Sequence, residues 1–332
     1  MLNPASPSPR LAVRRRSAAH SFAIRPRLTI ATLLAGASAA QPHSEGNAFD
    51  RRSFGSDVVE RAIDAAYLAE QYGTEDRLRI RIEAHRRYSE RTDDYLDWIL
   101  DRLQPRPGDL VVDVGCGVGS IHPQLCARGV RAVLGVDVSR AMVEASQRQA
   151  TERGLPVIAM EADAQALPLP DDAYDCAMAN HMLFHVPDQR SALRELRRVL
   201  RKPRGRVLLT AAAPGHRSRL REIHAHAAEE LGYAPAESVM HRFNLDHLDL
   251  VREVFPSAER FVREDAFLFP RADDALRYYA SGAIDALEDC PPDGSHRPRL
   301  LDLVGKQIEE IIRSEGIFRD PKDAGCFVAT AR

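Results

Sequence analysis

The sequence is poor in cysteine and lacks the cysteine spacings that build a fold. The five cysteines are Cys116, Cys126, Cys176, Cys290 and Cys326. An odd number of isolated cysteines with no CxxC pair argues against a disulfide-built secreted domain and against a thiolate zinc site. We therefore expect buried, reduced thiols.

Long apolar segments are also absent. The stretch 28–39 is shorter than the roughly 18 apolar residues that cross a bilayer, so we expect no membrane domain. It follows six arginines and ends in an A-x-A pattern, and residues 1–44 contain no Asp, Glu or Lys. Such a segment resembles a secretory signal or a transit peptide, and an unstructured extension is the alternative. We expect residues 1–49 to be a disordered or targeting-like leader of a cytoplasmic protein, with export or organelle import left open.

Lysine is scarce, so arginine supplies nearly all of the positive charge. The formal net charge is −2, and in residues 45–332 there are 40 basic and 48 acidic residues. An acidic body is poorly suited to binding phosphate backbones, so we expect no nucleic-acid partner. The 332 residues, 44% of them hydrophobic, are typical of a folded chain with two domains or one large α/β domain.

Short apolar runs alternate with helical patterns in the middle of the chain. The runs lie at residues 110–114, 132–136, 157–160, 174–179 and 206–210. Their continuous hydrophobicity is typical of strands buried on both faces. Between them, Ser139 and Asp188 are placed to cap helices over 140–153 and 189–201. This alternation predicts a doubly wound, mostly parallel α/β sheet.

Further elements are predicted on either side of this region. Helices are expected at 57–71, 76–90, 93–103 (capped by Thr92), 216–231, 245–255, 272–287 and 300–313, and strands at 260–269 and 327–331. The chain thus divides into the leader, an N-terminal helical cap over 50–107, a core over 108–214, and a segment over 215–332 with helices and the last strands.

A glycine-rich turn follows the first predicted strand. It reads Asp113-Val-Gly115-Cys-Gly117-Val-Gly119, and such glycines let a ligand approach main-chain N–H groups. A dinucleotide fingerprint places its third glycine one residue later, and the Gly-Lys-Ser/Thr of a Walker loop is absent. Asp137, at the end of the second strand, is placed to accept hydrogen bonds from ribose hydroxyls. These features indicate a nucleotide-like ligand without choosing between a dinucleotide and an adenosyl cofactor.

Several ordered motifs extend this pattern over residues 108–212. They read V-V-D-V-G-C-G-V-G, G-V-D-V-S, A-D-A-Q-A-L-P-L-P-D, Y-D-C-A-M-A-N-H-M-L-F-H-V-P-D and L-R-E-L-R-R-V-L. On these motifs the chain resembles the class I S-adenosylmethionine-dependent methyltransferases, of the small-molecule type that includes ubiquinone- and menaquinone-biosynthesis enzymes. The resemblance implies a Rossmann-like α/β fold with a mostly parallel seven-stranded sheet, N-terminal helices and a helical lid. Pro203-Arg204-Gly205 departs from the usual Pro-Gly-Gly, so that turn is expected to differ.

The resemblance implies roles around the methionine part of S-adenosylmethionine. Asp113 would orient the loop and approach the amino group through water, and Asn180 would offer that group its carbonyl oxygen. Gly115 and Gly117 would let the methionine portion pass. Tyr88, on an N-terminal helix, would reach the carboxylate, with a packing role as the alternative.

The resemblance also implies roles around the adenosine part. Asp137 would bind the ribose hydroxyls, and Val138 would flank the adenine. Asp163 would accept a hydrogen bond from the adenine amino group, with the Ala164 N–H nearby. The alternative, that the aspartates are solvated loop carboxylates, does not explain their ordered spacing.

Two histidines lie where a catalytic base would act. His181 and His185 follow the fourth strand, on the loop that the resemblance places opposite the transferable methyl group, and an acceptor hydroxyl or acidic carbon benefits from a general base. A packing or loop-stabilising role is the alternative for each. They are four residues apart, but no Glu intervenes and no third ligand is evident, so we expect no metal.

The leading hypothesis is therefore a methyltransferase that holds a small-molecule acceptor in line with the sulfonium methyl group, as a monomer or homodimer. The alternatives are a nucleic-acid or protein methyltransferase, or a protein that binds S-adenosylmethionine for other chemistry. The acceptor and its reacting atom (O, N or C) are not predicted by the sequence.

Overall fold

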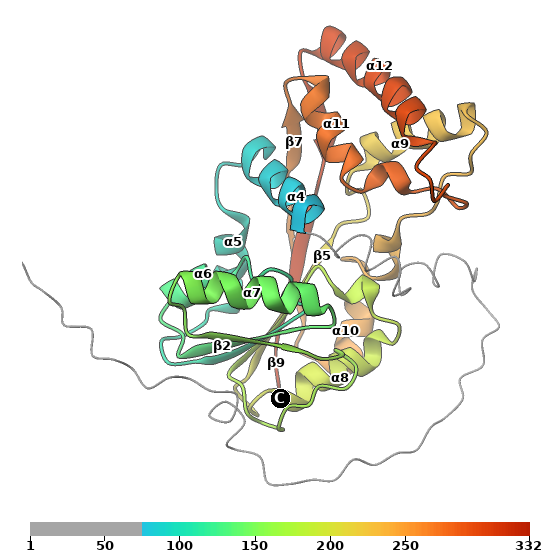
Figure 1. Ribbon diagram of the computed structural model, residues 1–332. Helices are drawn as coiled ribbons and strands as arrows, with labels where there is room; N and C mark the ends of the chain where they lie inside the picture. The colour runs from blue at the N-terminus through green and yellow to red at the C-terminus, as the bar shows by residue number, and fades with distance from the viewer. Residues whose placement is uncertain (1–74) are drawn as a thin grey trace, which may run out of the picture.

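The computed structural model describes residues 75–332. The predicted leader over 1–49 and the predicted helix over 57–71 lie outside these residues. The described chain forms two lobes, one built on a large sheet and one mostly helical (Figure 1). No helix within 75–332 is both long enough and apolar enough to cross a membrane.

The first lobe is built on a seven-stranded sheet. Its strands are β1 (Leu110–Val114), β2 (Ala132–Asp137), β3 (Val157–Glu161), β4 (Cys176–Asn180), β5 (Arg206–Ala212), β6 (Glu259–Arg263) and β9 (Ala324–Thr330). Their order is β3-β2-β1-β4-β5-β9-β6, with β1 to β5 parallel and β9 antiparallel to both of its neighbours. The predicted Rossmann-like, mostly parallel seven-stranded α/β fold is confirmed.

Helices cover both faces of this sheet (Figure 1). One face carries α5 (Tyr95–Leu103), α6 (His122–Ala127) and α7 (Arg140–Glu152), and the other carries α8 (Gln189–Val199) and α10 (Leu248–Val254). Side chains along a strand alternate between faces, so in β1 Val111 packs with the first set and Val112 with the second. Burial on both faces explains why the strands read as unbroken apolar runs.

Side-chain caps fix where the helices of this lobe begin. The Ser139 hydroxyl and the Asp188 carboxylate each accept a hydrogen bond from the N–H three residues on, at 3.5 and 3.0 Å, as predicted. Thr92 does not cap α5 as predicted. Asp94 does, because its carboxylate accepts from two N–H groups of the first turn, and aspartate is a strong N-cap.

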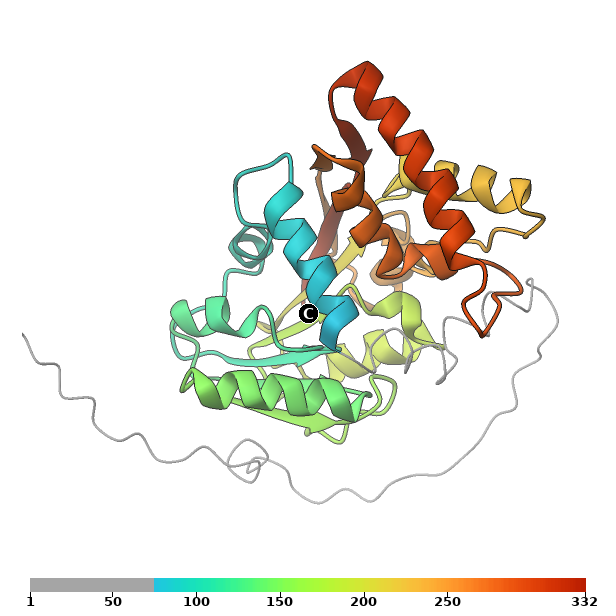
Figure 2. The same ribbon diagram turned by 45° about the horizontal axis from the view of Figure 1, so that its top comes forward.

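The second lobe combines helices with a two-stranded sheet. Two short 3-10 helices, η1 (Leu183–His185) and η2 (Val239–Arg242), lie outside it. The elements of the second lobe are α4 (Glu75–Tyr88), α9 (Ser218–Glu230), β7 (Ala266–Phe269), α11 (Ala272–Ala280), η3 (Ala283–Asp285), α12 (Arg297–Glu315) and β8 (Phe318–Pro321). These elements enclose a cluster of their own, in which Phe267, Phe269 and Tyr279 are fully buried. Helix α4 packs on β7 and α11 and lies on the side of this lobe nearest the main sheet (Figures 1 and 2).

One predicted strand is two strands. The prediction of a strand over 260–269 was wrong, because β6 and β7 pair in different sheets. The break falls at Asp265, whose N–H donates to the Asp323 carboxylate at 2.9 Å instead of to a strand partner. The buried Asp265 carboxylate binds Arg263 at 3.0 Å and also Lys322. This buried charged cluster ends one sheet and begins the other.

Other boundaries also differ from the predicted ones. The helix predicted over 272–287 ends at Ala280, before Ser281 and Gly282. Strand β8 was not predicted, because its proline and charged residues hide the strand pattern. The turn before β5 has only one of the two glycines of the usual Pro-Gly-Gly. The remaining Gly205 is required there, since an added Cβ would lie 2.6 Å from the Arg201 carbonyl oxygen.

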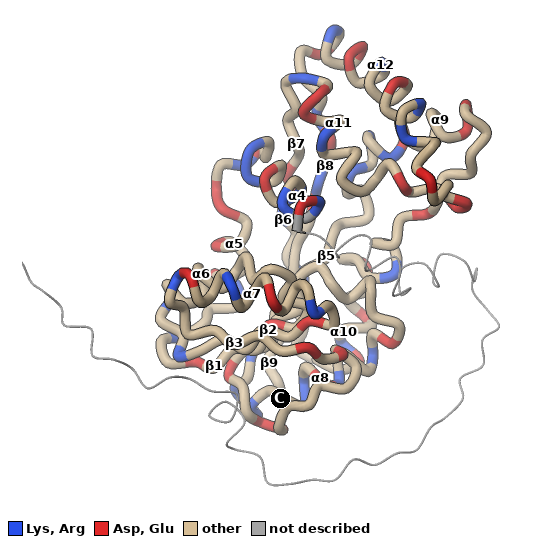
Figure 3. The backbone as a smooth tube through the Cα atoms, viewed as in Figure 1, with Lys and Arg blue, Asp and Glu red and all other residues tan. Residues whose placement is uncertain are grey.

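The N-terminal and C-terminal segments of the chain each contribute elements to both lobes. Within the 50–107 segment, α5 packs on β5 and β9 of the main sheet, whereas α4 packs in the second lobe. Within the 215–332 segment, α10, β6 and β9 belong to the first lobe. Acidic and basic residues are interspersed over both lobes (Figure 3).

Candidate active site

The glycine loop lies at the carboxyl end of β1, between β2 and β4. In open α/β sheets ligands bind at this point, where the strand order reverses. Gly115 and Gly117 have φ of 69° and 54°, a left-handed conformation that glycine adopts without steric cost. An added Cβ at Gly117 would meet nothing within 4 Å, so the loop is open there. A ligand can therefore lie against the main chain of Gly117.

Asp113 is buried beneath this loop and both of its carboxylate oxygens are engaged. Its Oδ1 accepts from Asn180 Nδ2, and its Oδ2 pairs with His122 Nε2, each at 3.1 Å. His122 is also buried and was missed by the sequence reasoning, because nothing in its position after the loop distinguishes it from an ordinary helix residue. The predicted role of Asp113 in orienting the loop stays a prediction.

Asn180 ends β4 beside the loop. Because its Nδ2 donates to Asp113, its Oδ1 points elsewhere, and this buried oxygen has no hydrogen-bond partner among residues 75–332. A buried polar atom without a partner costs about 1–3 kcal/mol. A positively charged amino group is a donor that would satisfy this oxygen.

The Asp137 carboxylate lies across from the loop at the end of β2. It accepts from the N–H groups of Gly117 and Ser139, both at 2.9 Å, and burial raises its pKa. The next side chain, Val138, is 61% exposed. An exposed valine beside a carboxylate is suited to a nucleoside, whose base covers the apolar group while its sugar meets the acid.

Asp163 and Ala164 follow β3 on the same edge of the sheet. The Asp163 carboxylate is exposed and accepts from the N–H of Gln165 at 2.8 Å. Ala164 is buried. The Gln165 side chain in turn accepts from the N–H of Asp188, at the start of α8. These bonds fix the loop that the prediction places against the adenine.

His181 comes directly after Asn180 and has a left-handed conformation, with φ of 49°. Its Nε2 lies 2.9 Å from Tyr95 Oη, and its N–H donates to Thr210 Oγ1 at 3.0 Å. Burial lowers the pKa of His181 to about 4. At neutral pH this imidazole is therefore uncharged and a weak base. Tyr95 and Thr210 were not singled out from the sequence, because they lie far from His181 along the chain.

His185 and Tyr88 occupy different surroundings. His185 closes η1, and its ring packs on Phe184 with centroids 4.2 Å apart. The Tyr88 ring packs on Phe269 at 4.9 Å within the second lobe. Burial raises the pKa of Tyr88, and a hydrogen bond with Asp274 raises it further. These contacts favour the packing alternative for Tyr88.

The expected burial of the thiols is found at three of the five cysteines, since Cys126 and Cys290 are only half-buried. All five are free, and Cys116, Cys176 and Cys326 are buried. Cys116 lies within the glycine loop, its Sγ 2.9 Å from where a Cβ on Gly135 would be. Burial raises the pKa of its thiol well above the usual value, and Asp113 raises it further. Cys116 therefore fills space and is not a nucleophile.

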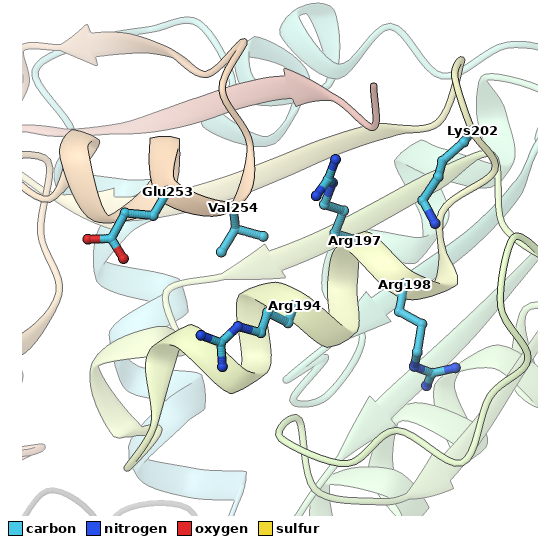
Figure 4. Close-up of a pocket in the computed structure, with 6 residues that line it drawn as sticks. All are labelled: Arg194, Arg197, Arg198, Lys202, Glu253 and Val254. Atoms are coloured by element: carbon cyan, nitrogen blue, oxygen red, sulfur yellow. The ribbon is translucent and has the colours of Figure 1, made fainter.

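Two other polar sites of the described chain are less suited to a ligand. A hollow of about 390 Å³ is lined by Arg194, Arg197, Arg198, Lys202, Glu253 and Val254 (Figure 4). It lies at the end of α8 that leads into β5, opposite the glycine loop, and its cations Arg198 and Lys202 are already paired with acids. In the second lobe, Asp285, Cys290 and His296 have ligand atoms within 4.8 Å. Arg297 already donates to both oxygens of Asp285 at 2.8 Å, so we propose no metal there.

The fold and the loop define a nucleoside-binding α/β protein of the kind that binds its ligand at the carboxyl edge of a parallel sheet. Residues 112–209 match the family model of a methyltransferase domain. This match confirms the resemblance to the S-adenosylmethionine-dependent methyltransferases over that segment and supports S-adenosylmethionine as the cofactor.

Curated relatives match the same part of the chain. An uncharacterized 37.1 kDa protein in transposon TN4556 of Streptomyces fradiae is 43% identical over 35% of this chain and 33% of its own length. The ubiquinone biosynthesis O-methyltransferase of Aeromonas salmonicida is 35% identical over 35% of this chain and 48% of its own. The 27-O-demethylrifamycin SV methyltransferase of Amycolatopsis mediterranei is 34% identical over 34% of this chain and 42% of its own. The chain thus spans less than half the length of each of these relatives.

A solved structure extends the likeness beyond the matched domain. It is that of a candidate methyltransferase from an antibiotic biosynthesis pathway of Anabaena variabilis, which aligns with 71% of this chain and 96% of its own at a TM-score of 0.51. The sequence identity is 18%, so this likeness concerns the fold alone.

Proposed function

We propose that the protein is an enzyme that transfers a methyl group from S-adenosylmethionine to a small-molecule acceptor. The observation that carries the proposal is Asn180 Oδ1, a buried oxygen without a partner in the described structure, beside the glycine loop of the matched methyltransferase domain. The amino group of a bound methionine moiety supplies the donor that this oxygen lacks.

The surrounding residues suit the rest of the cofactor. In the proposal Asp137 binds the ribose hydroxyls, Val138 covers one face of the adenine, and Asp163 and the Ala164 N–H meet its edge. Gly115 and Gly117 carry no side chains that would obstruct the methionine chain. S-adenosylmethionine supplies an electrophilic methyl group on a positively charged sulfur.

The acceptor side is proposed to lie between the two lobes. Helix α4 and the second lobe cover the edge of the sheet on which the cofactor residues lie, and a covered site excludes water and aligns the acceptor. The small-molecule class is supported by two of the named relatives, a ubiquinone biosynthesis O-methyltransferase and a 27-O-demethylrifamycin SV methyltransferase. A cytoplasmic location is proposed because the methyl donor is made inside cells. We propose a monomer or homodimer as the assembly.

His181 and His185 are proposed to take part in different ways. His181 directly follows Asn180 and is the one closer along the chain to the cofactor residues. His185 stabilises the η1 segment through its contact with Phe184. We therefore place His181, rather than His185, against the acceptor.

Incubation with methyl-labelled S-adenosylmethionine tests this function. Small-molecule extract fractions, bulk tRNA and unfractionated protein are offered as separate acceptors, and both labelled product and S-adenosylhomocysteine are measured. We expect labelled product from a small-molecule fraction, loss of turnover in Asp137→Ala, and full turnover in Asp249→Asn, an exposed acid on α10. Methylation of tRNA or protein instead, or no product from any fraction, would contradict the proposal.

A further inference from the structure

His181 is held in a conformation that its residue type disfavours. A left-handed backbone costs a non-glycine residue about 1–2 kcal/mol, and such outliers persist where the surrounding structure over-determines them, often at functional sites. Here two elements hold the residue. Thr210 of β5 accepts from the His181 N–H at 3.0 Å, and Tyr95 of α5 bonds its ring at 2.9 Å.

Each of these two bonds has a definite direction. The His181 N–H can only donate, so Thr210 Oγ1 accepts from it and keeps its own hydroxyl proton. Burial raises the pKa of Tyr95, so its hydroxyl keeps its proton at neutral pH, and a phenol O–H donates to a neutral imidazole nitrogen because that nitrogen is the stronger base. Tyr95 then donates its own proton to His181 Nε2. In a neutral ring the remaining proton must lie on Nδ1.

We propose that Tyr95 and Thr210 are positioning residues that fix His181 as a neutral hydrogen-bond donor through Nδ1, and that the acceptor it orients is an ionised oxygen acid, a carboxylate or a phenolate. The inference rests on the proposed methyl transfer and names the substrate class of the same site. It assigns to His181 the role of donor, in place of the general base expected from the sequence.

The chemistry balances without a base. A bond forms between the acceptor oxygen and the methyl carbon, and the bond from that carbon to sulfur breaks with its electron pair left on sulfur. The negative charge of the acceptor and the positive charge of the sulfonium cancel, and no proton moves. A ring whose pKa burial lowers to about 4 is a poor proton acceptor near pH 7 but a fully neutral donor.

The neighbouring groups favour an anion at this place. His85 and His216 are close enough to His181 for their charges to interact, and burial lowers the pKa of both well below the usual value. The positive charge of Arg217 lowers both further. The His85 ring packs on Phe267 with centroids 4.8 Å apart, although the residue as a whole remains exposed. The His216 ring donates from Nδ1 to the Asp323 carbonyl oxygen at 3.2 Å, so the Arg217 guanidinium is the group here that suits an oxyanion.

The tautomer of His181 is a direct test. The full chain, labelled with ¹⁵N in its histidines, is examined by long-range ¹H–¹⁵N spectroscopy at pH 7.5, with His181 assigned by its absence in His181→Asn. Asparagine tolerates the left-handed conformation, so that variant is expected to fold. We expect the His181 proton on Nδ1 and an unprotonated Nε2, and in Tyr95→Phe a shift of the population toward protonated Nε2. Tyr174→Phe is the matched control, because the buried Tyr174 hydroxyl has no partner in the described structure.

Ionised and neutral probes test the acceptor class on the same sample. Benzoate, salicylate and 4-nitrophenolate are titrated in the presence of S-adenosylhomocysteine, against the neutral benzamide. We expect ionised probes to shift the His181 Nδ1 resonance and benzamide to leave it unchanged. A proton on Nε2 in the wild type, no change in Tyr95→Phe, or no response to any ionised probe would overturn the inference. Calorimetric binding of S-adenosylhomocysteine, measured separately, reports on the proposed function itself. A failure of the proposed function can therefore be distinguished from a failure of the inference about His181.

Discussion

Replacing Asp320 by asparagine is expected to stabilise the protein at neutral pH. Asp320 lies in β8 with no exposed surface. Its Oδ1 accepts from the Leu220 N–H in the first turn of α9 at 3.1 Å, while its buried Oδ2 has no partner among the described residues. Burial raises its pKa from 3.8 to about 6. Asparagine keeps the acceptor for Leu220 and carries no charge to bury.

The magnitude follows from the pKa difference between the folded and unfolded states. Each pKa unit corresponds to 1.36 kcal/mol, so an ionised Asp320 costs the folded state about 3 kcal/mol above pH 6. Because the folded state binds the proton more tightly, this cost falls as the pH falls from 6 toward 4 and vanishes below the unfolded pKa. The advantage of Asp320→Asn is therefore expected to be up to about 3 kcal/mol at pH 8 and roughly half of that at pH 5.

Urea unfolding of the wild type and Asp320→Asn at pH 8, 6.5 and 5 measures this difference. Far-ultraviolet circular dichroism and tryptophan fluorescence are recorded together, so that a transition of one lobe alone is recognised. Asp249→Asn, at an exposed position in the first turn of α10, serves as the control and is expected to lie within about 1 kcal/mol of the wild type at every pH. A variant less stable than the wild type at pH 8, or an advantage that grows on acidification, would refute the reasoning.

Three further substitutions test the site. Asn180→Ala is expected to weaken S-adenosylhomocysteine binding in calorimetry by about 10- to 100-fold, since a hydrogen bond to a charged group contributes about 1.5–3 kcal/mol; unchanged affinity would contradict its role. Gly117→Ala is expected to fold with a loss of about 1–2 kcal/mol, because its φ is positive but its surroundings are open, and to lose most of its affinity for the same ligand. Wild-type binding by this variant would show that the ligand lies elsewhere. His122→Leu removes the partner of the buried Asp113 carboxylate and is expected to lower the free energy of unfolding by about 1–3 kcal/mol; an unshifted urea midpoint would show the pair to be dispensable.

The parallel part of the sheet was predictable because local signals there agree with the global fold. Continuous apolar runs, capping residues and glycines occur in a fixed order, and the five predicted strands coincide with β1 to β5 to within two residues at each end. The second lobe was less predictable. Its strands β7 and β8 are separated from the main sheet at Asp265 and Lys322, two residues that meet only in the folded chain.

The residues of the candidate site also divide into those that the sequence predicts and those that it does not. The loop glycines, Asp137 and Asn180 lie in motifs that identify them, and the sheet brings them to one edge. His122, Tyr95 and Thr210 lie in no motif, and each matters through a bond to a residue distant in sequence. A single sequence contains no signal for such pairs, because the hydrogen bond depends on the tertiary contact.

Calorimetric titration of the wild type, Asp137→Ala and Asp249→Asn with S-adenosylhomocysteine tests the central claim most directly. The wild type and Asp249→Asn are expected to bind one equivalent with the same affinity. Asp137→Ala is expected to bind at least about 10-fold more weakly, because the loss of hydrogen bonds to a charged group costs at least about 1.5 kcal/mol. Absence of binding by the wild type, or equal binding by Asp137→Ala, would contradict the assignment of a methyltransferase cofactor site to this edge of the sheet.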